Sequence, residues 1–142
     1  MKNLIGETLS ALENEYFTQR PIALEDRLSW LRTLKSQIES RRESLYQAFQ
    51  KDFSKPAIEV EGTEIFATIK ELDEIIDHLP EWVQSRHVPG NLILMGSSSE
   101  IVYDPKGVVL VISPWNYPLY LAVGLLAAAI SAGNSVVLKP SE

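Results

Sequence analysis

A long stretch without charged residues does most to limit how this chain can fold. Residues 107–138 contain no Asp, Glu, Lys or Arg, although 23% of the chain is charged. Within the stretch, residues 107–112 form a run rich in β-branched side chains, which is typical of a strand buried on both faces. Pro118 stands where a first helical residue could stand, and residues 119–130 are nearly all apolar. With a second apolar strand at residues 135–138, the stretch predicts a strand–helix–strand unit of an α/β fold.

The apolar helix of this unit is too short for a membrane span. Its run of apolar residues covers about a dozen positions, whereas a bilayer needs roughly 20. We therefore predict a helix buried in a protein core and no membrane span. A single crossover helix cannot cover two strands that are apolar on both faces, so we also expect part of the sheet to lack cover.

The polar residues of this region gather at one predicted edge of the sheet. A right-handed crossover makes the two strands parallel, so their carboxyl ends share the edge at which open parallel sheets bind ligands. Residues 113–118 follow the first strand, and residues 139–142 follow the second. Asn116 offers an amide donor, Lys139 an ammonium group, and Glu142 a carboxylate that can accept from hydroxyl groups.

Taken one by one, these residues have simpler interpretations. Asn is common in turns and at the starts of helices, so Asn116 could be structural, and Lys139 could be an ordinary lysine at a strand end. The G-x-G-x-x-G fingerprint of dinucleotide sites does not follow the first strand. The pattern therefore predicts a ligand-binding edge without identifying its ligand.

The first 90 residues have a different composition. They hold 11 of the 13 Lys and Arg and 16 of the 19 Asp and Glu, which is typical of solvated amphipathic helices. Apolar residues at helical spacing predict helices over residues 2–17, 24–52 and 58–78. The second helix would be about 43 Å long, more than the width of a small domain. Residues 92–95 and 100–104 flank a Ser-rich turn and predict a β-hairpin.

Composition excludes several classes of function. The net charge of −6 gives no electrostatic footprint for nucleic acid. The absence of cysteine excludes a thiolate metal site and a cysteine nucleophile within these residues, and His78 and His87 have no partner at metal-ligand spacing. We therefore predict no metal site. Glutamates interrupt the apolar residues at the start of the chain, so we predict no signal peptide and a cytoplasmic location.

Two motifs at the predicted edge resemble a known family. The first is P-W-N-Y-P at residues 114–118, and the second is A-G-N-x-V-V-x-K-P-S-E at residues 132–142. Both motifs, and the distance between them, resemble the NAD(P)-dependent aldehyde dehydrogenase family, and the resemblance is firm over residues 101–142. Tyr117, where many members carry phenylalanine, resembles the class 3-like branch, which is often associated with fatty or aromatic aldehydes.

The resemblance implies roles for the residues at this edge. Asn116 would donate its side-chain amide to the oxyanion that forms when a cysteine thiolate attacks an aldehyde. The nicotinamide side of an NAD or NADP site would be lined by Ile112, Ser113, Pro114 and Trp115. Lys139 and Glu142 would contact the adenosine ribose hydroxyls, and Ser141 would belong to the same cofactor-binding segment.

The resemblance also implies how the chain is organised. Residues 1–90 would form the N-terminal helical part of the cofactor domain, residues 91–105 an oligomerisation β-hairpin, and residues 106–142 the incomplete start of the Rossmann-like NAD(P)-binding domain. The expected fold is α/β, with N-terminal helices, a hairpin arm and the first strand–helix–strand unit of a parallel sheet. The full-length protein would be a homodimer or tetramer that acts on an aldehyde.

The residues that the family uses for covalent chemistry are absent from these 142 residues. The family's cysteine nucleophile, glutamate general base and glycine-rich loop lie further along the chain, and covalent thiohemiacetal chemistry needs a thiolate. We therefore expect the N-terminal portion of an enzyme that oxidises an aldehyde to a carboxylic acid, inactive by itself. The alternative is a non-catalytic truncated interaction module that associates with itself or with intact subunits.

Overall fold

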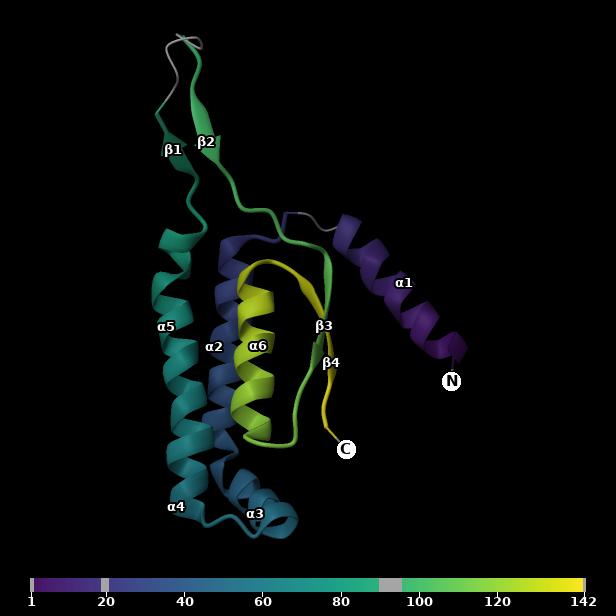
Figure 1. Ribbon diagram of the computed structural model, residues 1–142, viewed down its shortest axis with the longest axis vertical. Helices are drawn as coiled ribbons and strands as arrows, with labels where there is room; N and C mark the ends of the chain where they lie inside the picture. The colour runs from purple at the N-terminus through teal and green to yellow at the C-terminus, as the bar shows by residue number, and fades with distance from the viewer. Residues whose placement is uncertain (1, 19–20, 90–95, 142) are drawn as a thin grey trace.

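The computed structural model describes residues 2–18, 21–89 and 96–141. Three helices lie side by side at its centre, and a parallel two-stranded sheet lies against one of them (Figure 1). The elements, in chain order, are α1 (Lys2–Thr18), α2 (Leu24–Ser40), α3 (Arg42–Phe53), α4 (Ala57–Val60), the π-helical segment η1 (Glu61–Ile65), α5 (Phe66–Trp82), β1 (Arg86–Val88), β2 (Ser99–Ile101), β3 (Val108–Ile112), α6 (Pro118–Ser131) and β4 (Ser135–Lys139). The mixed α/β class is thus as predicted.

The strand–helix–strand unit has the predicted topology. β3 pairs with β4 in parallel, and the register ends with Ile112 opposite Lys139. Between the strands, α6 begins at Pro118. Gly133 follows the end of α6 with a φ of 81°, a left-handed conformation that glycine adopts without steric cost. The predicted residues therefore form the unit and place its two strand ends at one edge.

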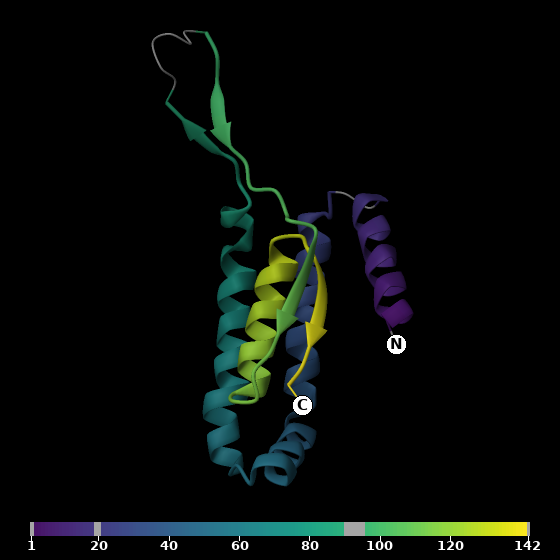
Figure 2. The ribbon, with the colours of Figure 1, turned by 45° about the vertical axis from the view of Figure 1, so that its right-hand side comes forward.

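One face of this sheet packs on α6, and the opposite face is partly open. Leu110 and Ile112 of β3 are 59% and 64% exposed. α1 stands beside the sheet (Figure 2), and the hydroxyl of Tyr16 donates to the carbonyl of Pro105 at 2.9 Å. The expected shortage of cover is therefore confirmed among the described residues.

The core forms where α2, α5 and α6 meet. Its buried side chains include Leu28, Leu31, Ile38, Ile69, Leu72, Ile75, Leu79, Val123 and Ala127. Lys35 of α2 and Asp73 of α5 join the rim of this core through a 2.5 Å ion pair. Because α6 is held by both helices, the core also fixes the start of α6, where the predicted site lies.

The prediction of one helix over residues 24–52 is wrong. The helix breaks at Arg41, whose φ of −108° and ψ of 16° lie outside the helical region, and α3 begins at the next residue. The backbone N–H of Arg41 bonds to the carbonyl of Ile38, which tightens the last turn of α2. The change of direction returns Phe49, which is 6% exposed, to the core instead of carrying it away from the molecule.

The third predicted helix, residues 58–78, differs at its end and in its interior. It continues to Trp82 with Pro80 inside it, and it contains a π-helical segment over Glu61–Ile65. Proline removes one backbone donor from a helix, but packing holds the last turn in place. Leu79 is 2% exposed, and the ring of His78 stacks on that of Trp82 with centroids 5.7 Å apart.

A β-hairpin is present in this region, and it includes a strand, β1, that the sequence did not predict. β1 pairs antiparallel with β2, with Arg86 opposite Ile101, and this hairpin projects from the body of the molecule (Figures 1 and 2). The predicted strand at residues 92–95 lies outside the described residues. β2 overlaps the predicted strand 100–104 only in part, and residues 102–104 are not in a strand. Arg86 and His87 are exposed, so β1 has no buried face whose pattern could have predicted it.

The contact between α3 and η1 leads to a prediction about pH. The hydroxyl of Tyr46 donates to Glu61 at 2.6 Å, Arg42 pairs with the same carboxylate, and these bonds hold the pKa of Glu61 below its ordinary value of 4.5. A lowered carboxyl pKa adds stability above the unfolded pKa, and that stability is lost as the pH falls through the folded pKa. We expect Glu61→Gln to lower the free energy of unfolding by about 0.5–1 kcal/mol at pH 7.

Urea unfolding at several pH values would measure this difference. It should shrink as the pH falls from 4.5 through the lowered pKa of the folded chain, because the carboxyl is protonated first in the unfolded chain and then in the folded chain as well. Glu7→Gln, which changes an exposed glutamate of α1, is the matched control and should have no measurable effect. A difference that grows on acidification would contradict the prediction.

Candidate functional site

The ends of β3 and β4 bring the two predicted segments together. Ile112 lies opposite Lys139, and the backbone N–H of Ser113 donates to the carbonyl of Lys139 at 3.0 Å. This bond extends the parallel ladder one step beyond β3, and Ser113 is only 4% exposed. Residues 113–117 and 139–141 therefore leave the sheet next to each other, as the sequence predicts.

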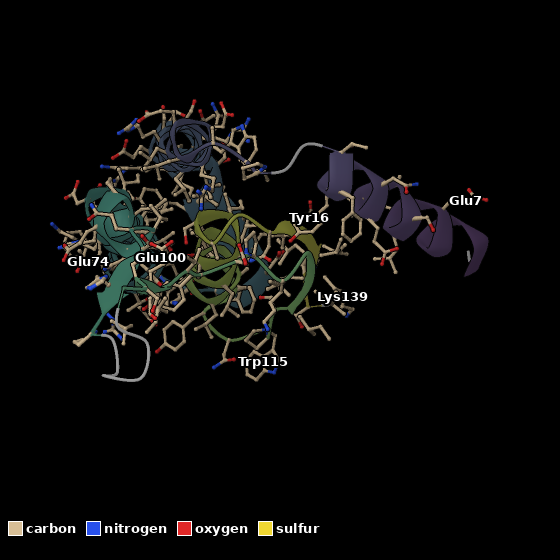
Figure 3. All side chains as sticks on the ribbon, turned by 90° about the horizontal axis from the view of Figure 1, so that it is seen from above. Glu7, Tyr16, Glu74, Glu100, Trp115 and Lys139 are labelled. Carbon is tan, nitrogen blue, oxygen red and sulfur yellow. The ribbon has the colours of Figure 1, made fainter. Side chains whose placement is uncertain are left out.

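The turn between β3 and α6 presents its polar residue outward. Asn116 is exposed, and Trp115, which is 67% exposed, projects from the body of the molecule (Figure 3). The next residue, Tyr117, has a φ of 48° and a ψ of 53°, and Pro118 then begins α6. A left-handed residue other than glycine costs about 1–2 kcal/mol, so neighbouring contacts must hold this turn.

A pocket of about 690 Å³ lies beside the turn. It is lined by Ala48, Phe49, Asp52, Phe53, Ser113, Trp115, Pro118, Leu119, Pro140 and Ser141. Three predicted site residues, Ser113, Trp115 and Ser141, are among them. Four other predicted site residues are neighbours of these in sequence but do not line the pocket: Ile112, Pro114, Asn116 and Lys139. Glu142 lies outside the described residues.

The wall opposite the strand ends comes from α3, which sequence reasoning did not connect with the site. Phe49 and Phe53 supply apolar surface, and the centroids of their rings are 5.8 Å apart. Asp52 adds a carboxylate to this wall of the pocket. The break at Arg41 is what turns α3 toward the strand ends. No local sequence signal shows where a helix will turn relative to a distant sheet edge, so these residues could not have been predicted.

A buried ion pair lies behind the turn. Glu64 of η1 is 0% exposed, and its Oε1 accepts from Nζ of Lys55 at 2.9 Å. Its Oε2 accepts from the backbone N–H groups of Leu119 and Tyr120, both at 3.2 Å. These N–H groups belong to the first turn of α6, where unpaired donors and the helix dipole favour an anion.

Sequence reasoning also missed Glu64, although a signal was present. Glu64 lies four residues after Val60 and four before Thr68, so it stands on the apolar stripe of its helix. A charged residue on a buried stripe needs a partner. Its position in η1 fits the frequent use of π-helical turns at functional sites.

The arrangement can bind a ligand and can donate hydrogen bonds at the sheet edge. It offers the amide of Asn116, the ammonium group of Lys139 and a pocket with aromatic walls. Among the residues that the structure describes, no cluster of His, Cys, Asp or Glu could hold a metal ion. None of the described helices is both long and apolar enough to cross a membrane.

The fold and the site define a class before any comparison. Parallel strands joined by a crossover helix, with a pocket at their carboxyl ends, are the first unit of a Rossmann-like α/β domain. Comparison with known proteins then gives the family. The aldehyde dehydrogenase family model matches residues 7–142, so the chain belongs to the aldehyde dehydrogenase family, and the resemblance noted in the sequence is confirmed.

Individual relatives agree with this assignment. The chain is 36% identical to aldehyde dehydrogenase family 3 member B1 from Homo sapiens, over 97% of this chain and 30% of that protein. Staphylococcus aureus AldH in a substrate-bound state superimposes with a TM-score of 0.93 at 32% identity, over 97% of this chain and 30% of that one. An NAD-dependent benzaldehyde dehydrogenase from Corynebacterium glutamicum gives a TM-score of 0.79 at 26% identity, over 94% and 28% of the two chains. The chain thus spans less than a third of the length of these relatives.

Proposed function

We propose that this chain is the N-terminal part of an NAD(P)-dependent aldehyde dehydrogenase that oxidises an aldehyde to a carboxylic acid. The observation that carries the proposal is the exposed amide of Asn116 on a turn that is fixed at both ends, beside a pocket at the strand ends. Membership of the family supports it, as does the Corynebacterium glutamicum relative, which is described as an NAD-dependent benzaldehyde dehydrogenase.

The residues present suit a dinucleotide. The pocket combines aromatic and apolar surface from Phe49 and Trp115 with the polar groups of Ser113 and Ser141. Lys139 ends β4 directly opposite Ile112, where its ammonium group can reach ribose hydroxyls or phosphate oxygens. Bound NAD or NADP would supply the hydride acceptor. We propose that residues 112–115 and 139–142 bind it, and that residues 106–142 begin the cofactor domain.

Asn116 would act on the aldehyde oxygen. Negative charge builds up on that oxygen when a nucleophile adds to the carbonyl carbon, and an amide donor that is already in place stabilises the charge without rearrangement. An asparagine amide donates without changing its own charge. The nucleophilic thiolate must come from outside these residues, because the chain contains no cysteine. We propose that the general base also lies outside them.

The other parts of the chain would support assembly. We propose that residues 91–105, with β1 as the strand that pairs with β2, belong to an oligomerisation arm in a homodimer or tetramer, and that the helices within residues 1–90 pack around the cofactor domain. Projection of β1 and β2 from the body supports this role for the hairpin (Figure 1). The absence of cysteine and the open face at Leu110 and Ile112 favour, as the second candidate, a non-catalytic module that binds intact subunits.

Activity of the complete protein would test the proposal. We expect the reading frame that contains these residues to yield a protein that reduces NAD⁺ or NADP⁺ when hexanal or benzaldehyde is added. The 142-residue chain alone should give no aldehyde-dependent reduction. A complete protein that reduces neither cofactor with either aldehyde, yet copurifies with an intact dehydrogenase, would overturn the enzyme proposal in favour of the interaction module.

A further inference from the structure

We propose that Glu64, paired with Lys55, is a positioning residue that fixes the turn carrying Asn116. The inference rests on the proposed function, because it assigns to Glu64 the task of holding the oxyanion donor in place. Neither residue lines the pocket beside the turn, so neither is expected to touch the substrate.

The carboxylate of Glu64 joins segments that are far apart in sequence. One oxygen accepts from Lys55, and the other accepts from the N–H groups of Leu119 and Tyr120. The side chain of Lys55 is 13% exposed and that of Glu64 is 0% exposed. Two charges removed this far from water need close partners, and here the start of α6 supplies part of that partnership.

Movement at the start of α6 would pass directly to Asn116. Only Tyr117 and Pro118 separate Asn116 from the N–H groups that Glu64 binds. The ring of Pro118 fixes its own φ, and Tyr117 is held in a left-handed conformation, so this connection has little freedom. At the other end of the turn, Ser113 is bonded to Lys139. The turn is therefore held at both ends, and Glu64 provides one of the two attachments.

Lys55 contacts the turn in a second way. Its ammonium group lies 4.7 Å from the centroid of the Tyr117 ring, within range of a cation–π contact. The only other carboxylate paired with Lys55 among the described residues is that of Glu59, 3.9 Å away and 52% exposed. Lys55 thus contacts the side chain of the left-handed residue, Tyr117, and Glu64 binds the backbone of the helix that follows it.

Two variants that differ only in the acceptor separate positioning from stability. Lys55→Met with Glu64→Leu removes both charges and leaves no oxygen for the N–H groups of α6. Lys55→Met with Glu64→Gln also removes both charges but keeps an oxygen that can accept them. Both variants avoid leaving a single charge buried, so both should fold.

Hydrogen exchange measured by mass spectrometry gives a readout that does not depend on activity. In the protein as its cells make it, the peptide covering residues 113–121 should exchange about tenfold faster or more in the Leu variant, because N–H groups without an acceptor open more readily. In the Gln variant the exchange should stay within a few-fold of the wild type, because only the contact of Lys55 with the ring of Tyr117 is lost. Equal exchange in the two variants would overturn the inference.

Kinetics of the complete enzyme give the second readout. We expect the Leu variant to lose about tenfold to a hundredfold in kcat, since a displacement of about 1 Å can cost that much. The KM for the cofactor should change less, because Ser113 keeps its bond to Lys139. The Gln variant should keep kcat within a few-fold of wild type. In an Asn116→Ala background, the change to Leu should cost little more, because the group that it positions is already gone.

The outcomes distinguish the two proposals. If Asn116→Ala lowers kcat but the Leu and Gln variants have equal kcat, the positioning role is overturned and the proposed function stands. If the complete protein oxidises no aldehyde, the proposed function fails, and hydrogen exchange still decides whether Glu64 holds the turn. A loss of activity in the Leu variant that is equally large without Asn116 would mark a structural role and overturn the inference.

Discussion

Asn116→Ala in the complete enzyme should lower kcat by about 10²–10³-fold, the usual effect of removing one oxyanion donor. The KM for NAD or NADP should change little, because Asn116 does not line the pocket beside the turn. Protein stability should also change little, since Asn116 is exposed and its side chain has no hydrogen bond among those found in the described residues. Steady-state kinetics with varied aldehyde and varied cofactor would separate these quantities.

Two further variants make this experiment specific. Asn14→Ala removes an exposed asparagine from α1 and should leave kcat unchanged. Asn116→Asp keeps the size of the side chain but replaces the amide donor with an acceptor, so it should lose at least as much kcat as alanine does. A complete enzyme in which Asn116→Ala retains wild-type kcat would contradict the assigned role.

The strand–helix–strand unit could be predicted because local sequence determines most of it. Composition alone predicts buried strands at residues 107–112 and 135–138. Pro118 and Gly133 mark the two ends of the helix between them. Parallel pairing then follows from the handedness of crossover connections. This step placed Ser113 and Lys139 side by side without any knowledge of the rest of the molecule.

The parts that could not be predicted depend on contacts between distant residues. Arg41 lies within a stretch whose apolar spacing continues as a helix on either side, and the break there accompanies the packing of Phe49 into the core. Pro80 similarly looks like a stop signal until the burial of Leu79 is known. Local patterns report propensity, and tertiary packing overrides them at such points.

The same reasoning explains which parts of the site were missed. Asn116 and Lys139 belong to motifs, so their neighbours in sequence identify them. Lys55 and Glu64 belong to no motif that we recognised, and their importance arises from a helix start more than 50 residues further along, at Leu119. A charged residue on an apolar stripe is the one local sign of such a role, and it points to a buried partner without naming it.

Lys55→Met should lower the free energy of unfolding by about 3–5 kcal/mol, because it leaves the carboxylate of Glu64 buried without its charged partner. The length of the side chain is kept, so the loss comes mainly from charge and not from a cavity. Lys51→Met, an exposed lysine of α3, is the matched control and should stay within about 0.5 kcal/mol of wild type. Urea unfolding would measure both variants.

Adding Glu64→Gln to Lys55→Met should restore most of the lost stability, although it removes a second charged group. The penalty arises from one unpaired buried charge, and it disappears when neither charge is present. Failure of this rescue would show that Lys55 stabilises the fold through its contacts with the rings of Phe49 and Tyr117 and not through Glu64. Successful rescue, together with a loss of kcat only when the acceptor oxygen is removed, would mean that the charges of this pair matter for folding and the oxygen for the turn. The two contributions of Glu64 are then separable, although one side chain makes both.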